Sequence, residues 1–242
     1  MRTAIAFNRI IRRQLQRHAA WLPVVSPFSL GDYGIYERGI FSRLGNITDL
    51  GVDFDPLPGG TATLKFETSA GLEVSLFVEG QGKVPQLPAT DVQAKAEFEY
   101  KRARSFLLRA PSLTSTALSD IAGTATHLAQ HPRWRRRYKL VTELLVADEA
   151  TIIATASRNN TVTVEGKANV LKDFVDGKVG AGVTVKASSE LALEIVGDSG
   201  PVALKLAKVR GSGRVGLEGL EAGQPAFEQE PTDEDYEPED DL

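Results

Sequence analysis

The sequence predicts an α+β fold, with a twisted, mostly antiparallel sheet, an N-terminal amphipathic helix and a middle helical segment. Several segments alternate apolar and polar residues, which is the period of a strand that buries one face. Two other segments place their apolar residues at helical spacing. With 242 residues, 42% of them hydrophobic, the chain is long enough for one large domain with a substantial core.

The first expected element is a helix from Arg2 to His18, which Pro23 and Pro27 follow. Its apolar residues fall on one side, and arginines without any acid cover the other. This pattern fits a helix in the interface of an anionic bilayer, where each basic residue contributes about 1 kcal/mol. A surface helix that packs its apolar side on the core has the same pattern. The candidate lipid-binding residues are Phe7, Arg9, Ile10, Ile11, Arg12, Arg13, Leu15, Arg17 and Trp21.

Further along, a period of two predicts strands. The segment 94–101 alternates as a long amphipathic strand, although its Ala, Lys and Glu residues leave a helix as the alternative. The other expected strands are a glycine-punctuated hairpin in 31–47, two strands in 61–66 and 72–78, a buried strand in 140–146 and a last strand in 202–209.

A second helix is expected from Ser112 to His131, because apolar residues recur there at helical spacing and Pro132 follows. Directly after it comes a dense cationic patch with aromatic residues. Its candidate residues are Arg133, Trp134, Arg135, Arg136, Arg137 and Lys139.

The clearest alternation lies in two arms of about ten residues, 161–170 and 178–187. That is close to the roughly 9–11 residues with which a tilted strand crosses a bilayer. A half-buried hairpin in water has the same periodicity. The candidate membrane-hairpin residues are Val162, Val164, Ala168, Val170, Val179, Ala181, Val183 and Val185.

Charge divides the chain into two parts. Nine acids and no base lie between Glu228 and Asp241, so that 23 of the 32 acids remain against 28 Lys and Arg before this segment. We therefore expect a basic domain over residues 1–210, followed by a Gly-rich linker and a disordered acidic tail over 211–242.

No motif predicts an enzyme, a cofactor or a metal site. The segment 211–216 matches G-x-G-x-x-G, but it runs into further glycines and the acidic block instead of a helix, which favours a linker. His127 and His131 are four residues apart, and no further metal ligand accompanies them. Capping of the helix end is therefore a better interpretation of this pair than a zinc site. The chain has no cysteine, which is consistent with a reducing, cytoplasmic compartment.

The order of these features resembles the pore-forming N-terminal domain of gasdermins. The opening 6–16 with the following Leu22-Pro23-Val24-Val25-Ser26 is similar to that family's first helix and the stretch after it. The segment 138–145 resembles the Tyr-Val-Val-Thr-Glu-Val-Leu strand of animal members. The chain departs from animal members in having no room for a large inhibitory C-terminal domain, and from bacterial members in lacking an acylated cysteine near its start.

The resemblance implies a membrane pore-forming protein, a short bacterial or fungal-type member of the family, that causes cell death, as in bacterial defence. Such a protein binds anionic lipid through the first helix, oligomerises and inserts β-hairpins as a closed barrel. It is cytoplasmic when inactive and acts at the inner face of the cell membrane, after a protease releases the C-terminal region. The alternatives are a soluble protein-interaction module and a nucleic-acid binder that uses residues 133–139.

Overall fold

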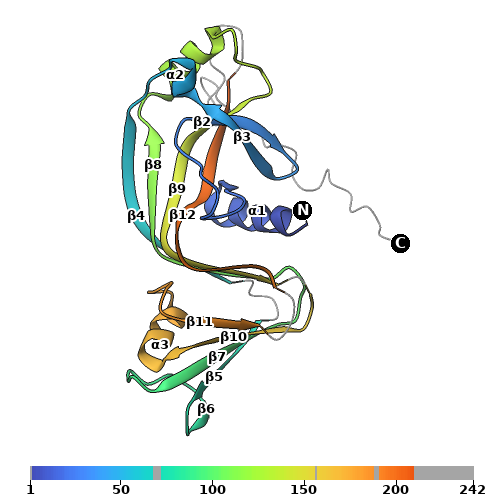
Figure 1. The fold of residues 1–242 in the computed structure, drawn as a ribbon, viewed down its shortest axis with the longest axis vertical. Helices are drawn as coiled ribbons and strands as arrows, with labels where there is room; N and C mark the ends of the chain where they lie inside the picture. The colour runs from blue at the N-terminus through green and yellow to red at the C-terminus, as the bar shows by residue number, and fades with distance from the viewer. Residues whose placement is uncertain (1, 68–71, 156, 188–190, 210–242) are drawn as a thin grey trace, which may run out of the picture.

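The computed structural model describes residues 2–67, 72–155, 157–187 and 191–209. It confirms the α+β class, with two mostly antiparallel sheets and three α-helices in the described part (Figure 1). Among these helices, none is long and apolar enough to span a membrane. The expected Gly-rich linker and acidic tail lie outside the described residues.

The larger sheet is built on four long strands that bend where they approach the smaller sheet (Figure 1). Its antiparallel order is β1-β12-β9-β2-β3, and β8 pairs with both β9 and β4. The strands are β1 (His18–Ala19), β2 (Asp32–Glu37), β3 (Ile40–Asn46), β4 (Pro56–Glu67), β8 (Phe106–Leu118), β9 (Lys139–Thr155) and β12 (Leu191–Lys208). The predicted hairpin, buried strand and last strand are thus confirmed, although β9 and β12 are much longer than expected.

The smaller sheet has the order β11-β10-β7-β5-β6. Its strands are β5 (Leu72–Val78), β6 (Gly82–Val84), β7 (Gln93–Tyr100), β10 (Asn160–Lys167) and β11 (Thr184–Ala187). The strand expected in 94–101 is confirmed and its helical alternative is wrong, because β7 pairs with β10 along its whole length and with β5 from Ala94 to Tyr100. This pairing overrides the helix propensity of its Ala, Lys and Glu residues.

Helix α1 (Arg2–Leu15) confirms the predicted amphipathic helix, which ends three residues earlier than expected. The chain leaves the helix at Gln16, whose positive φ of 53° is incompatible with a further helical turn. The short 3-10 helix η1 (Ile47–Leu50) follows β3, and it is closed by a capping box between Asn46 and Asp49.

Only the second half of the expected helix 112–131 is helical. Helix α2 (Ile121–Gln130) begins after Asp120, whose side chain accepts a hydrogen bond from the amide of Gly123. Residues 112–118 belong instead to β8, where the strands β4 and β9 flank them on both sides. The strand continues through Pro111 because neither register assigns this residue a partner, so its missing amide hydrogen costs no ladder hydrogen bond.

The predicted ten-residue arms are also shorter as strands than expected. Ala168 and Val170 lie in helix α3 (Ala168–Asp176), which ends at Gly177 with a positive φ of 82°. Val179, Ala181 and Val183 lie outside the strands, since β11 begins at Thr184. The prediction from alternating apolar residues overlooked the helical spacing of Ala168, Leu171 and Phe174. These three side chains are buried against the smaller sheet.

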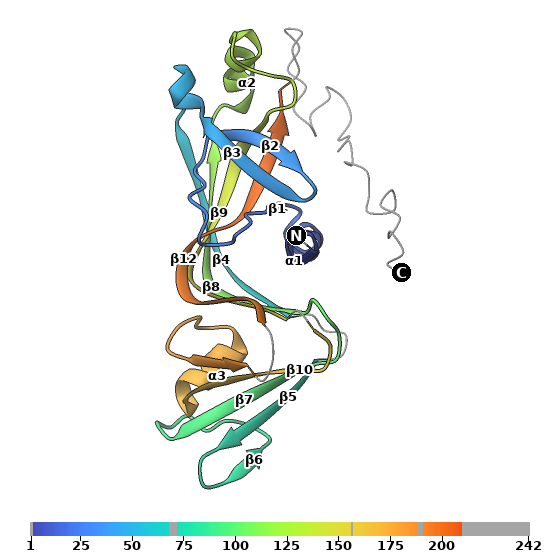
Figure 2. The same cartoon turned by 45° about the vertical axis from the view of Figure 1, so that its right-hand side comes forward.

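Successive side chains on the bent strands point alternately toward α1 and toward α3. Phe106 and Leu108 point to the side of α1, and Leu107 points to the side of α3. Helix α3 therefore lies between the bent strands and the smaller sheet, whereas α1 lies on the opposite face of the bent strands (Figure 2). The order of layers is α1, larger sheet, α3, smaller sheet.

Candidate membrane-binding surface and convertible sheet

The candidate lipid-binding residues of α1 separate into a buried and an exposed set. Phe7 and Ile11 are fully buried in the core cluster on the larger sheet, and Ile10, Leu15 and Trp21 pack against that cluster. Arg9 and Arg13 are exposed, and Arg12 is partly exposed. In this conformation α1 therefore presents its basic face to the surroundings, while its apolar face stabilises the core.

Arg17 has a structural role. Its guanidinium group donates two hydrogen bonds, each 3.0 Å long, to the carboxylate of Glu143 on β9. Both bonds come from Nη2, and both side chains are partly buried, which favours a stable charge-assisted pair. This contact fastens the end of α1 to the larger sheet.

The smaller sheet has one polar and one apolar face. Ion pairs between neighbouring side chains cover the polar face, as in Lys95 with Glu97 (2.6 Å) and Lys186 with Glu165 (2.7 Å), and Lys101 with Glu73. The hydrogen bond between Lys101 and Glu73 lowers the pKa of Glu73 and raises the pKa of Lys101. The opposite face is lined by Ala94, Ala96, Phe98, Tyr100, Val162 and Val164, which are buried.

Helix α3 covers this apolar face. Its buried residues Leu171 and Phe174 share one core cluster with the apolar residues of β7 and β10. The helix has nine residues and follows β10 without a loop. Leu107 and Ile153 of the larger sheet belong to the same cluster, so the apolar face is enclosed by α3 together with the larger sheet.

A buried arginine holds the end of this cover. Arg109 on β8 is 1% exposed, and its Nε donates to the main-chain oxygen of Phe174 at 3.3 Å. Its Nη1 donates to the main-chain oxygen of Phe66 at 3.1 Å, and its Nη2 lies 2.8 Å from the carboxylate of Glu67. A cation at the last carbonyls of a helix is favourable because the helix dipole is negative there.

Tyr100 is a second buried polar group at this junction. Burial raises its pKa, an effect that nearby Arg109 opposes and Glu67 reinforces. Its hydroxyl group is buried without a hydrogen-bond partner among the described residues.

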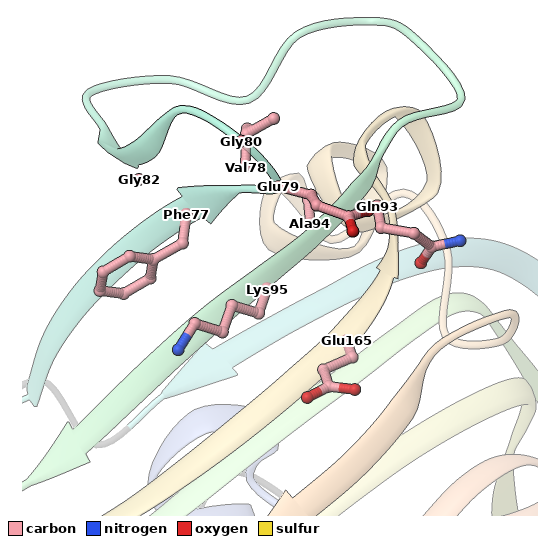
Figure 3. Close-up of a pocket in the computed structure, with 9 residues that line it drawn as sticks. All are labelled: Phe77, Val78, Glu79, Gly80, Gly82, Gln93, Ala94, Lys95 and Glu165. Carbon is pink, nitrogen blue, oxygen red and sulfur yellow. The ribbon is translucent and has the colours of Figure 1, made fainter.

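An open hollow of about 490 Å³ lies on the smaller sheet near the turn between β5 and β6 (Figure 3). Lys95 and Glu165, from the neighbouring strands β7 and β10, line it together with Phe77, whose ring centroid lies 4.5 Å from the Lys95 ammonium group. Across the described residues, no group of three acidic, His or Cys side chains is placed to hold a metal ion.

The candidate patch 133–139 lies at the end of the larger sheet that is remote from the smaller one. Arg133, Arg135, Arg136 and Arg137 are exposed and Lys139 is partly exposed. Trp134 is only 9% exposed, and its ring packs within 5.6 Å of those of Tyr33 and Tyr138. Its indole is thus engaged in the core, which weighs against its stacking on nucleic-acid bases.

The structure brings most membrane-hairpin candidates together in or against the cluster under α3, and it keeps the candidate lipid-binding helix on the other side of the larger sheet. The candidates in this cluster are Val162, Val164, Ala168, Val179, Val183 and Val185. Sequence reasoning missed Arg109, Glu67 and the helix α3. The helical spacing of Ala168, Leu171 and Phe174 before Gly177 is the signal that could have revealed α3. Nothing in the local sequence marks Arg109, because its partners come from segments 42 and 65 residues away.

The chain was compared with other proteins by sequence. It matches no model of a known protein family and none of the curated proteins. The resemblance to gasdermins therefore rests on the short segments quoted above and on the order of elements along the chain.

Proposed function

We propose that this protein binds anionic membranes, oligomerises and inserts strands of the smaller sheet as part of a pore, in the manner of gasdermins. The observation that carries the proposal is the two-faced smaller sheet, whose apolar face is covered by the short helix α3 and by residues of the larger sheet. Its opposite face carries paired charges, which suits the water-filled side of a membrane channel.

The segment that follows β10 is compatible with two conformations. Val162, Val164, Gly166, Ala168 and Val170 continue one alternation, but the structure turns this segment into a helix at Ala168. Extension of β10 through Val170 lengthens the strand to about the 9–11 residues that cross a bilayer. Because backbone groups in lipid need partners within the protein, the inserted strands must close with those of other subunits.

The exposed arginines of α1 support the membrane as the first partner, since they lie on a surface helix without an acidic residue. The pore acts at the inner face of the cell membrane after release of the C-terminal region by a protease. The buried indole of Trp134 weighs against the alternative of a nucleic-acid binder.

Release of a trapped dye from vesicles tests the proposal. The full chain and a chain that ends at Arg210 are added to vesicles with and without anionic lipid. We expect release from the anionic vesicles by at least one form, with the shorter chain the more active. Absence of release by both forms from anionic vesicles would contradict the proposal.

A further inference from the structure

The cationic patch, defined here as Arg133, Arg135, Arg136 and Arg137, concentrates positive charge at one end of the larger sheet. Its four arginines are exposed and lie within five consecutive residues. Lys139 on β9 and Lys208 on β12 lie next to it as register partners of one another. Positive charges that lie so close together in the chain repel each other, and an anionic partner would relieve this repulsion.

The described part of the chain supplies no such partner to most of the patch. None of the ion pairs between described residues joins a carboxylate to Arg133, Arg136 or Arg137. Arg133 donates to the main-chain oxygen of Asp49 at 2.8 Å, and Arg135 donates to that of Pro132 at 2.7 Å. These neutral acceptors fix the direction of two side chains but leave the positive charge uncompensated.

The course of the chain leads an acidic segment past this patch. The last described residue, Val209, is buried in the same cluster as Trp134, and the preceding Lys208 is the register partner of Lys139. The nine acids between Glu228 and Asp241 follow after the 18 residues 210–227, which span at most about 60 Å. The acidic segment is thus joined covalently to a residue that lies beside the patch, and this raises its effective concentration there.

We propose that the cationic patch is the docking surface for the acidic segment 228–241 of the same chain. Screening limits the attraction to about 8 Å at physiological salt, so the segment must lie directly against the arginines. The patch is preferred over the arginines of α1 because Val209 leaves the fold within the cluster that supports the patch. This proposal is independent of pore formation.

The full chain itself offers a direct test, because it has no cysteine and only two tryptophans. A nitroxide label on Pro238→Cys broadens the NMR signals of nearby groups. We expect the indole N–H signal of Trp134 to lose most of its intensity. The indole signal of Trp21 is the internal reference, since that ring packs with Phe7 in another cluster and should keep its intensity.

Charge reversal in the labelled protein separates docking from chance proximity. Arg135→Glu with Arg136→Glu should restore the Trp134 signal, as should about 1 M salt, where the screening length falls to about 3 Å. The matched control is Lys83→Glu with Arg102→Glu, which makes the same charge change at exposed residues of the smaller sheet and its flank and should leave the broadening intact.

Three outcomes would overturn the proposal. The first is an undiminished Trp134 signal in the labelled parent protein. The second is broadening that survives reversal of the patch, and the third is equal broadening of both indole signals. If an undiminished signal is accompanied by loss of oligonucleotide or anionic-vesicle binding in the Arg135→Glu, Arg136→Glu variant, the patch serves that other polyanion.

Discussion

Arg109 and Glu67 form a 2.8 Å ion pair between β8 and β4, in which the arginine is 1% exposed and the glutamate is 33% exposed. The pair is asymmetric, because the carboxylate reaches water and the guanidinium group does not. Through its bond to Phe174, the same arginine fixes the end of the helix that covers the smaller sheet. The pair thus connects the larger sheet to the element that encloses the apolar face.

This asymmetry predicts unequal effects of removing the two partners. Glu67→Ala should lower the free energy of unfolding by about 2–4 kcal/mol, because it leaves a buried cation with only neutral acceptors. Arg109→Met should cost less, about 1–2 kcal/mol, since an apolar side chain of similar length replaces the charge and Phe174 keeps a hydrogen bond from Gly177.

Urea unfolding of the two single variants and of the double variant measures these costs. In the Arg109→Met protein, Glu67→Ala should have an effect of no more than about 0.5 kcal/mol. Equal single effects that simply add in the double variant would show that the two residues do not act as a pair.

The buried Tyr100 predicts a loss of stability at alkaline pH. An unfolded tyrosine ionises near pH 10, while burial raises the pKa of Tyr100 in the folded state. Its contribution to stability is therefore complete below pH 10 and falls above it, by up to about 1.4 kcal/mol per pH unit.

Tyr100→Phe should remove this contribution and leave the stability near pH 7 unchanged or raised by about 1 kcal/mol, because the hydroxyl lacks a partner among the described residues. The measurement is urea unfolding of both proteins between pH 8 and 11. Parallel decline of the two proteins above pH 10 would assign the alkaline sensitivity to other groups.

The basic face of α1 predicts a measurable share of membrane affinity. Arg12→Gln with Arg13→Gln should weaken binding to anionic vesicles by about 2 kcal/mol, or roughly 30-fold, because each cation near the surface contributes about 1 kcal/mol. Co-sedimentation with anionic vesicles at several salt concentrations measures this effect. Lys83→Gln with Arg102→Gln is the control. An equal loss of binding in the control would show that the effect depends on net charge and not on the position of the arginines on α1.

Local patterns in the sequence were sufficient to predict α1, the hairpin of β2 and β3, and the alternation of β7 and β10. The middle helix was predicted too long, because the Ser- and Thr-containing segment 112–118 is a strand only through its pairing with β4 and β9. Such pairing joins segments that are distant in the sequence, and no local period reveals it.

The candidate site was only partly predicted, because it also depends on contacts between residues that are distant in the sequence. Alternation located Val162 and Val164, but it could not show that the chain after Lys167 folds back as α3 over them. The exposed arginines of α1 follow from its period, whereas the binding of Arg17 to Glu143 depends on a residue 126 positions away.

Val74 on β5 allows insertion of the smaller sheet into the membrane to be tested with little damage to the fold. It shares the apolar face with its register partner Phe98, but it is 43% exposed and α3 leaves it uncovered. Its neighbour Ser75 faces the polar side together with its register partner Glu97. Lysine at either position should change the stability of the protein in water by only about 0.5 kcal/mol.

The most direct measurement is dye release from anionic vesicles by Val74→Lys and Ser75→Lys, in whichever form of the chain permeabilises them. A lysine on the lipid side of a membrane strand costs about 2–4 kcal/mol near the midplane and recurs in every subunit, so Val74→Lys should lower release by roughly 10-fold or more. Ser75→Lys should release dye at the rate of the parent protein. Equal rates for the two variants would contradict insertion of this sheet into the membrane.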